Sequence, residues 1–217
     1  NASQSISIGN TLVAPAGFQE GLDVTIGSTT GGGAGAGSIS NLAADSSSNA
    51  VSIGLNGIGA GNQNGTVTLN LTSNGTISGL ANLALAPAIV QVNATGYNLA
   101  AGNATPTPVL LGNQRIGGAA TQALTVTNTA PVGAFTEGLN ATFGGNTGNA
   151  TNNGASIGLL AGGASNASMT VGVDTSAAGA RSGAVTLNYV SDGAGTSGLG
   201  VTSVGSQTIN VSGNVYQ

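Results

Sequence analysis

Short runs in which apolar residues alternate with small polar residues dominate the chain and predict β-strands. A serine separates Ile6 from Ile8, and Thr68 and Asn70 separate the apolar residues of the run 67–71. A period of two places apolar side chains on one face of a strand and polar side chains on the other, which is typical of an antiparallel sheet with one buried face. The same alternation recurs in the runs 22–26, 51–55, 90–92, 124–126, 139–143, 169–173, 185–189 and 209–211.

Turn-forming pairs separate many of these runs. Asparagine or aspartate followed by glycine predicts a tight turn, because these residues tolerate positive φ. The pairs are Asn64-Gly65, Asn74-Gly75, Asn153-Gly154 and Asp192-Gly193. The glycine-rich segments 31–37 and 144–154 are predicted to be loops.

The chain contains two copies of one sequence unit, about 118 positions apart. The string Phe18-Gln19-Glu20-Gly21-Leu22 corresponds to Phe135-Thr136-Glu137-Gly138-Leu139, and further pairs of strings keep the same offset. This spacing is the size of a domain and not of a solenoid rung. We therefore predict two domains, residues 1–100 and residues 101–217.

The two predicted domains differ at their beginnings. Residues 101–118 read as the opening strand of the second domain, and they have no counterpart before Asn1. The favoured interpretation is that the chain is a mature or cropped piece of a longer tandem array. The alternative is that the first domain borrows its opening strand from another molecule.

The strand pattern predicts an all-β fold of tandem immunoglobulin-like β-sandwiches without disulfides. About seven short strands per unit match that architecture, and the chain has no cysteine. A parallel β-helix is the alternative, but it would require a repeat of 20–25 residues, roughly one rung, which the chain does not show.

Composition excludes several classes of chemistry. Only 4% of the residues are charged, against about 25% in ordinary soluble domains, and there is no cysteine, histidine, lysine or tryptophan. These absences exclude the usual zinc sites, Ser-His-Asp triads, Schiff bases and phosphate-binding P-loops. With two arginines and a net charge of −4, nucleic acid is an unsuitable partner. The longest apolar stretch is too short for a membrane-spanning helix.

A few polar residues are candidates for a site. Glu20 and Glu137 occupy the same repeat position, and the favoured role is a carboxylate bonded to the backbone of a strand-entry loop; a calcium ligand or an interdomain contact is the alternative. Calcium needs six to eight oxygen ligands, roughly, whereas the aspartates are scattered along the chain. Arg115 and Arg181 could pair with Glu137 or Asp174. We predict no catalytic residue, no cofactor-binding residue, no metal ligand and no cofactor.

Aromatic residues and glycosylation sequons complete the candidate list. Phe18 and Phe135 are predicted to be core residues, and Tyr97 and Tyr216 to close the last strand of each unit; a sugar-stacking platform is the alternative. Glycans are candidate partners, although this composition generates sequons by chance. The sequons begin at Asn1, Asn64, Asn70, Asn74, Asn93, Asn103, Asn140, Asn149, Asn166 and Asn210.

The second unit resembles a known family of repeats. Residues 109–118 (VLLGNQRIGG), followed by LTVTNTAP at residues 124–131, resemble the opening of bacterial Hydin-like, or choice-of-anchor D, immunoglobulin-like repeats. Residues 191–216 also look like repeats of large secreted surface proteins. The resemblance implies tandem seven- or eight-stranded sandwiches at or beyond the cell surface, and it implies no catalytic residues.

These observations predict a structural protein. The favoured function is a non-catalytic module of an extracellular fibre, sheath or surface layer, which associates with copies of itself through edge strands and glycine-rich loops. The alternative is a spacer in the stalk of a bacterial adhesin. A carbohydrate-binding module or glycosidase is disfavoured, because no two carboxylates are close in sequence and no tryptophan is present.

Overall fold

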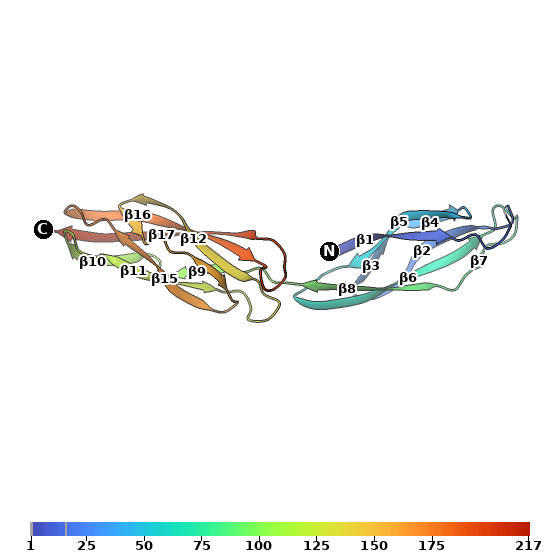
Figure 1. The fold of residues 1–217 in the computed structure, drawn as a ribbon, viewed down its shortest axis with the longest axis horizontal. Helices are drawn as coiled ribbons and strands as arrows, with labels where there is room; N and C mark the ends of the chain where they lie inside the picture. The colour runs from blue at the N-terminus through green and yellow to red at the C-terminus, as the bar shows by residue number, and fades with distance from the viewer. Residues whose placement is uncertain (1, 16) are drawn as a thin grey trace. The chain divides into compact units, whose positions relative to one another are not determined.

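The computed structural model describes residues 2–15 and 17–217, and they form two compact units. Unit 1 spans Asn1–Gly96 and unit 2 spans Tyr97–Gln217 (Figure 1). The described residues contain strands and turns but no helix, so none of them forms a helix able to cross a membrane. The predicted all-β class is confirmed.

Unit 2 is a sandwich of two sheets. One sheet has the order β13-β15-β11-β9, and the other has the order β10-β17-β16-β12-β14. Nearly all neighbouring strands are antiparallel, whereas β10 runs parallel to β17. The strands are β9 (Gly102–Thr105), β10 (Val109–Arg115), β11 (Thr121–Asn128), β12 (Gly138–Gly148), β13 (Ala150–Asn152), β14 (Ile157–Leu160), β15 (Ser165–Val173), β16 (Gly179–Asp192) and β17 (Thr202–Tyr216).

Unit 1 repeats most of this arrangement. One sheet has the order β1-β5-β3, and the other has the order β4-β2-β6-β7, with β8 also paired to β6. The strands are β1 (Ala2–Asn10), β2 (Gly21–Gly31), β3 (Gly33–Ala36), β4 (Ser38–Leu42), β5 (Ser46–Leu55), β6 (Gly61–Asn74), β7 (Leu83–Ala84) and β8 (Ala88–Gly96). The described residues of neither unit form the coil of parallel rungs that a β-helix requires. The immunoglobulin-like type of the sandwiches stays a prediction.

Most residues of the glycine-rich segments lie in strands, so the prediction of these segments as loops was wrong. Residues 33–36 pair with β5 in one sheet, and the next residues, 38–42, pair with β2 in the other. This change of sheet requires close backbone approach: a Cβ on Gly33 would lie 2.3 Å from the carbonyl oxygen of Thr66. Glycine is therefore present for close packing as well as for flexibility. Unit 2 makes the same change of sheet from β13, within the segment 144–154, to β14, which follows it.

The predicted turn at Asn64-Gly65 was also wrong. Both residues lie inside β6, and a Cβ on Gly65 would lie 2.5 Å from the nitrogen of Gly33. Gly65 therefore allows the two sheets to approach at this crossing. Gly183 occupies the same place in unit 2, where its Cβ would lie 2.1 Å from the carbonyl oxygen of Thr147.

The core of unit 2 is more completely buried than that of unit 1. Leu124 and Val126 on β11 are fully buried, whereas their counterparts on β1, Ile6 and Ile8, are only partly buried. On the last strand, Ile209 and Val211 are buried, whereas the corresponding Val90 and Val92 are partly exposed. The difference lies at β1 and β8, because each of them pairs on one side only, whereas their counterparts β11 and β17 pair on both sides.

Candidate functional site

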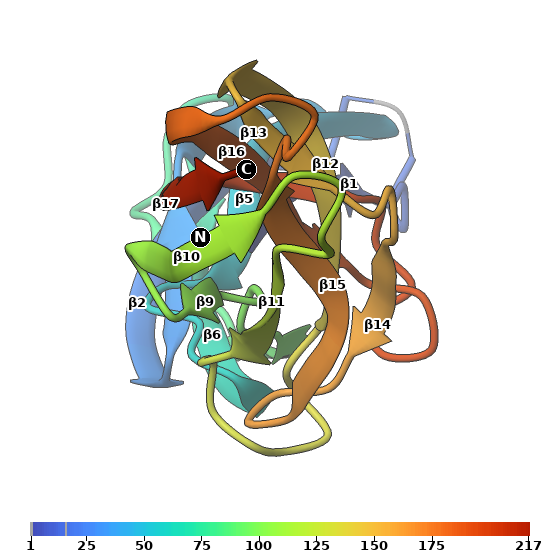
Figure 2. The ribbon, with the colours of Figure 1, turned by 90° about the vertical axis from the view of Figure 1, so that its left-hand side faces the viewer.

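Residues 97–115, here called the linking segment, cover two strand edges of unit 2. Within this segment β9 pairs with β11 in one sheet, and β10 pairs with β17 in the other (Figure 2). Ala104 and Val109 from the segment are almost fully buried in the core of the unit. The segment therefore closes both sheets along the same side of the sandwich.

The first residues of the linking segment dock on the loop before β12. The rings of Tyr97 and Phe135 have centroids 5.7 Å apart with a tilted geometry, which is favourable for aromatic pairs. The Asn98 amide donates to the Phe135 carbonyl at 2.8 Å, and the Glu137 amide donates to the Asn98 carbonyl at 3.0 Å. The Asn98 side chain also donates to Thr136 at 3.3 Å. These contacts set the position at which the segment enters the sandwich.

Glu137 is a buried carboxylate that connects the docked segment to the sheet. Its Oε2 accepts a hydrogen bond from the Ser191 hydroxyl at 2.7 Å, and its Oε1 accepts one from Ser197. The Ser191 oxygen in turn accepts the Ala100 amide of the linking segment at 2.8 Å. The sequence predicted a carboxylate bonded to backbone, whereas the partners are serine hydroxyls. A burial of this kind is tolerated because each oxygen has a donor.

Glu20 repeats this arrangement in unit 1, where it is half-buried. It accepts hydrogen bonds from the hydroxyls of Ser73, at 2.6 Å, and Ser78. These two bonds, that from Ser73 first, lower the pKa of Glu20 below its usual value.

The lowered pKa of Glu20 predicts an acid-sensitive contribution to the stability of unit 1. A carboxyl group with a depressed folded-state pKa stabilises the fold above its unfolded pKa and loses that effect as the pH falls through the folded-state pKa. The melting temperature of unit 1 should therefore fall as the pH drops below about 4.5, the ordinary value. Calorimetry at a series of pH values should show a weaker dependence in Glu20→Gln. An identical dependence in both proteins would contradict this assignment.

An asparagine ends β1 in unit 1 and β11 in unit 2, and its side chain forms hydrogen bonds to neighbouring backbone groups in both. In unit 2 the Asn128 side chain donates to the carbonyls of Glu137 and Leu160, and its oxygen accepts the Ala101 amide at 3.0 Å. In unit 1 the side chain of Asn10 donates to the equivalent carbonyls of Glu20 and Leu42. Sequence reasoning missed this role, although the repeat itself placed Asn10 opposite Asn128.

Each unit contains a hydrogen-bonded aspartate–asparagine pair, and the two residue types stand in opposite positions in the two units. In unit 1, Asn74 donates to both carboxylate oxygens of Asp23, at 2.9 and 3.0 Å. In unit 2 the corresponding positions are reversed, and Asn140 donates to Asp192 at 2.8 Å. Hydrogen bonds from the Ala194 amide first, and then from Asn140, lower the pKa of Asp192. The pair therefore keeps an amide-to-carboxylate hydrogen bond and one negative charge in either orientation.

This exchange predicts a compensated double variant. Asn74→Asp should destabilise unit 1 by about 1–2 kcal/mol, because two carboxylates would then face each other. Adding Asp23→Asn should restore most of the loss, since the double variant copies the orientation in unit 2. Urea unfolding of the two single variants and the double variant measures the coupling. Simple additivity of the two effects would contradict the pairing.

The aromatic predictions were only partly correct. Phe18 is 83% exposed, so it is not a core residue, whereas Phe135 is half-buried beneath Tyr97. Tyr97 does not close a strand: it follows β8 and belongs to the linking segment of unit 2. Tyr216 ends β17 and is 54% exposed. Nothing in the local sequence distinguishes Phe18 from Phe135, because their difference in exposure arises from the residue that covers them.

The remaining candidates do not gather at one place. Arg181 donates to the carbonyl of Ala177, and it makes the smallest contribution to the lowered pKa of Asp174, after the backbone and side chain of Ser176. Of the sequon asparagines, Asn74 and Asn140 use their side-chain amides within the fold. Among residues 2–15 and 17–217, no three acidic side chains lie close enough together to hold a metal ion.

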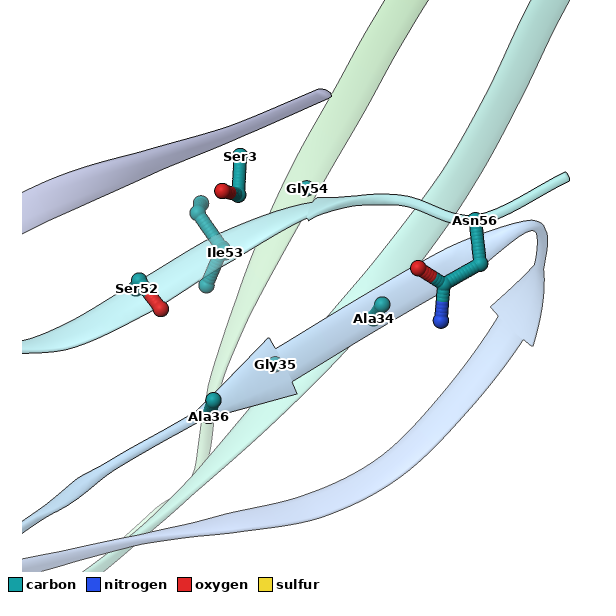
Figure 3. A pocket seen from close by; sticks show the side chains of 8 residues that line it. All are labelled: Ser3, Ala34, Gly35, Ala36, Ser52, Ile53, Gly54 and Asn56. Atoms are coloured by element: carbon teal, nitrogen blue, oxygen red, sulfur yellow. The ribbon is translucent and has the colours of Figure 1, made fainter. Parts of the chain in front are cut away.

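A shallow hollow of about 270 Å³ lies on the β1-β5-β3 sheet of unit 1. Figure 3 shows its small lining side chains, among them Ala34 and Ala36 on β3 and Ser52 on β5, with Ser3 on β1 and the amide of Asn56 nearby. The lining has hydroxyl and amide groups but no titratable group, and it suggests no reaction.

Comparisons with known proteins give the chain no family. No known family model matches it, and no curated protein matches it. Among solved structures it is similar to CfaE, the adhesive subunit of CFA/I fimbria of enterotoxigenic Escherichia coli, at 10% identity and a TM-score of 0.32, covering 94% of this chain and 82% of that one. It is also similar to domains 4 and 5 of the S-layer protein SbsC, at 13% identity and a TM-score of 0.22, covering 94% and 74%. Both scores are low, so the function proposed below rests on the chain's own geometry, and the resemblance to choice-of-anchor D repeats stays a prediction.

Proposed function

We propose that the chain is a non-catalytic structural module of an extracellular fibre, sheath or surface layer. The observation that carries this proposal is the pair of unpaired strand edges in unit 1, on β1 and β8, in a chain with almost no charge. An unpaired edge offers a row of backbone donors and acceptors to another chain, and natural proteins usually protect such edges with lysine or proline. These two edges have no lysine to oppose pairing.

The self-association in this proposal uses edge strands. The glycine-rich segments 31–37 and 144–154 were expected to contribute as loops, but most of their residues are committed to β-pairing within a unit. Their backbone groups are therefore less suited to bind another copy. The acidic groups favour a structural role as well, because Glu20 and Glu137 are each engaged by two serines.

The competing proposal is a spacer in the stalk of an adhesin. The serial repetition of one unit favours it, since spacers need serial connection but no lateral contact. Both proposals place the protein outside the cell or at its surface, with no nucleic acid as partner.

Assembly of the purified chain distinguishes the two proposals. A fibre or layer module should form ordered polymers as its concentration rises, visible by electron microscopy and as fast-sedimenting species in the analytical ultracentrifuge. A chain that remains monomeric at every concentration would contradict the fibre proposal and favour the stalk.

A further inference from the structure

Unit 1 has open edges at the two places that the linking segment covers in unit 2. Strand β1 corresponds to β11 but pairs only with β5, and β8 corresponds to β17 but pairs only with β6. In unit 2 these places are taken by β9 and β10. Within the part of the chain that the structure describes, unit 1 has no strand along either edge.

The lack of strands along these two edges also explains why the core of unit 1 beneath them is partly exposed. In unit 2, Ala104 and Val109 pack into the cluster that buries β11 and β17. In unit 1, Ile8 on β1 and Val92 on β8 correspond to the buried Val126 and Val211, but they are left partly exposed. An added strand pair would remove this apolar surface from water, which favours binding.

The polar groups that hold the linking segment in unit 2 are also repeated in unit 1. The Asn128 oxygen accepts the Ala101 amide, whereas the oxygen of its counterpart Asn10 accepts the side-chain amide of Gln19 at 2.8 Å. The Thr129 amide donates to the Ala101 carbonyl, whereas the carbonyl of the corresponding Thr11 accepts the same Gln19 amide. At the asparagine oxygen the Gln19 side chain thus takes the place that the Ala101 amide has in unit 2, whereas at the threonine the two units use different backbone groups.

A hollow in unit 1 corresponds to the docking place of Tyr97 and Asn98. It has a volume of about 350 Å³ and is lined by Phe18, Glu20, Ile77 and Ser78, among others. Phe18 and Ile77 are largely exposed, at 83% and 59%. In unit 2 the counterpart of Phe18 is covered by the ring of Tyr97. The hollow therefore fits an aromatic residue, and Phe18 and Glu20 correspond to the two residues whose backbone groups bond Asn98 in unit 2.

We propose that unit 1 binds the linking segment of a further repeat of this same kind. The occupant is an extended segment with almost no charge that begins with Tyr-Asn or Tyr-Gln, runs antiparallel along β1 and then crosses to run parallel along β8. An unrelated single strand could satisfy one edge, whereas this segment satisfies both edges and the aromatic hollow. Tyr216-Gln217 corresponds in the repeat to Tyr97-Asn98, so the first two residues of such a segment recur in the chain.

One contact of unit 2 has no equivalent in unit 1. The Gln207 side chain bonds both the amide and the carbonyl of Ala104, at 2.8 and 2.9 Å, and Ala88 stands at the corresponding position of β8. We therefore expect a segment to bind unit 1 less tightly than residues 97–115 are held in unit 2. This inference names the partner that binds the open edges of β1 and β8. Its biological role rests on the proposed function.

A synthetic peptide with the sequence of residues 97–115 tests the inference on the full chain. Bound peptide should slow amide hydrogen exchange about tenfold or more at residues 7–10 of β1 and 92–96 of β8, and it should raise the melting temperature of unit 1. The control peptides carry Val109→Asp, at a buried position, or Leu110→Asp, at a position 76% exposed. Both have the same charge, but only the second should protect these amides.

A cis version keeps the test decisive if the free peptide binds too weakly to detect. A copy of residues 97–118 fused ahead of Asn1 reproduces the spacing between Gly118 and Ala119, because Asn1 corresponds to Ala119. Protection of the same amides in this fusion, and its loss with Val109→Asp in the added copy, supports the inference. Unchanged amide exchange at β1 and β8 with both the free peptide and the fused copy would overturn the inference. Protection of these amides by self-association of the chain, if the peptide does not displace it, would overturn the inference as well. Ordered polymers without peptide binding would leave the proposed function standing and refute only this inference.

Discussion

Val109→Asp in the full chain is expected to release the linking segment from unit 2 and to lower the free energy of unfolding of that unit by about 3–5 kcal/mol. Val109 is 1% exposed and lies in the core beside β17. An unpaired carboxylate at this place loses its hydration without gaining a partner. Urea unfolding followed by hydrogen exchange should show new exposure of β11 and β17, while unit 1 keeps its stability.

Leu110→Asp is the matched control for this variant. Leu110 is the next residue of β10, but it is 76% exposed, so the same charge remains in water. Its effect on stability should be within about 0.5 kcal/mol. Equal losses in the two variants would show that charge, and not burial of the segment, controls the stability of unit 2.

Gly183→Ala should destabilise unit 2 by about 3 kcal/mol, because the two sheets approach too closely to admit a methyl group. The new Cβ would lie 2.1 Å from the carbonyl oxygen of Thr147 and 2.6 Å from the nitrogen of Ala150. Both are backbone atoms, so relief requires movement of whole strands. Thermal unfolding of the variant measures the loss.

Gly145→Ala provides the comparison within the same sheet. Gly145 lies on β12, and its added Cβ would meet nothing within 4 Å. Loss of glycine flexibility in the unfolded chain should then leave stability unchanged or raise it by up to about 1 kcal/mol. A similar loss of stability in both variants would contradict the role assigned to Gly183.

The period-two alternation was sufficient to predict the all-β class and many of the strands outside the glycine-rich segments. Val67, Leu69, Val185 and Leu187 are buried as that pattern requires. The positions of glycine were misread, because the sequence does not distinguish a glycine in a loop from one under a crossing strand. Gly65 follows Asn64 as in a turn, yet it lies opposite Gly31 within a sheet. Only the pairing of distant segments reveals this use.

The site was less predictable than the fold. The repeat identified Glu20 and Glu137 as equivalent, but the serines that bind them are 53 to 60 positions away in the sequence. Phe18 and Phe135 have the same local sequence context and differ because Tyr97 covers only one of them. Burial at an edge depends on which segment pairs there, and local patterning does not contain that information.

The two units therefore represent one sandwich in which the edges of β11 and β17 are covered and one in which the corresponding edges of β1 and β8 are open. Closure in unit 2 uses backbone pairing, two buried apolar residues and the buried Glu137. Unit 1 keeps the corresponding asparagine, glutamate and serines. Because unit 1 keeps these residues, its open edges can hold the linking segment of another repeat, and repeats could join in series in this way.

Hydrogen exchange of the dilute, monomeric chain compares the edges most directly. If the two edges of unit 1 are open, the amides of residues 7–10 and 92–96 should exchange at least about tenfold faster than those of residues 125–128 and 211–215. Equal slow exchange in both sets, under conditions where the ultracentrifuge shows only monomer, would mean that unit 1 is already closed and would contradict its role as an acceptor.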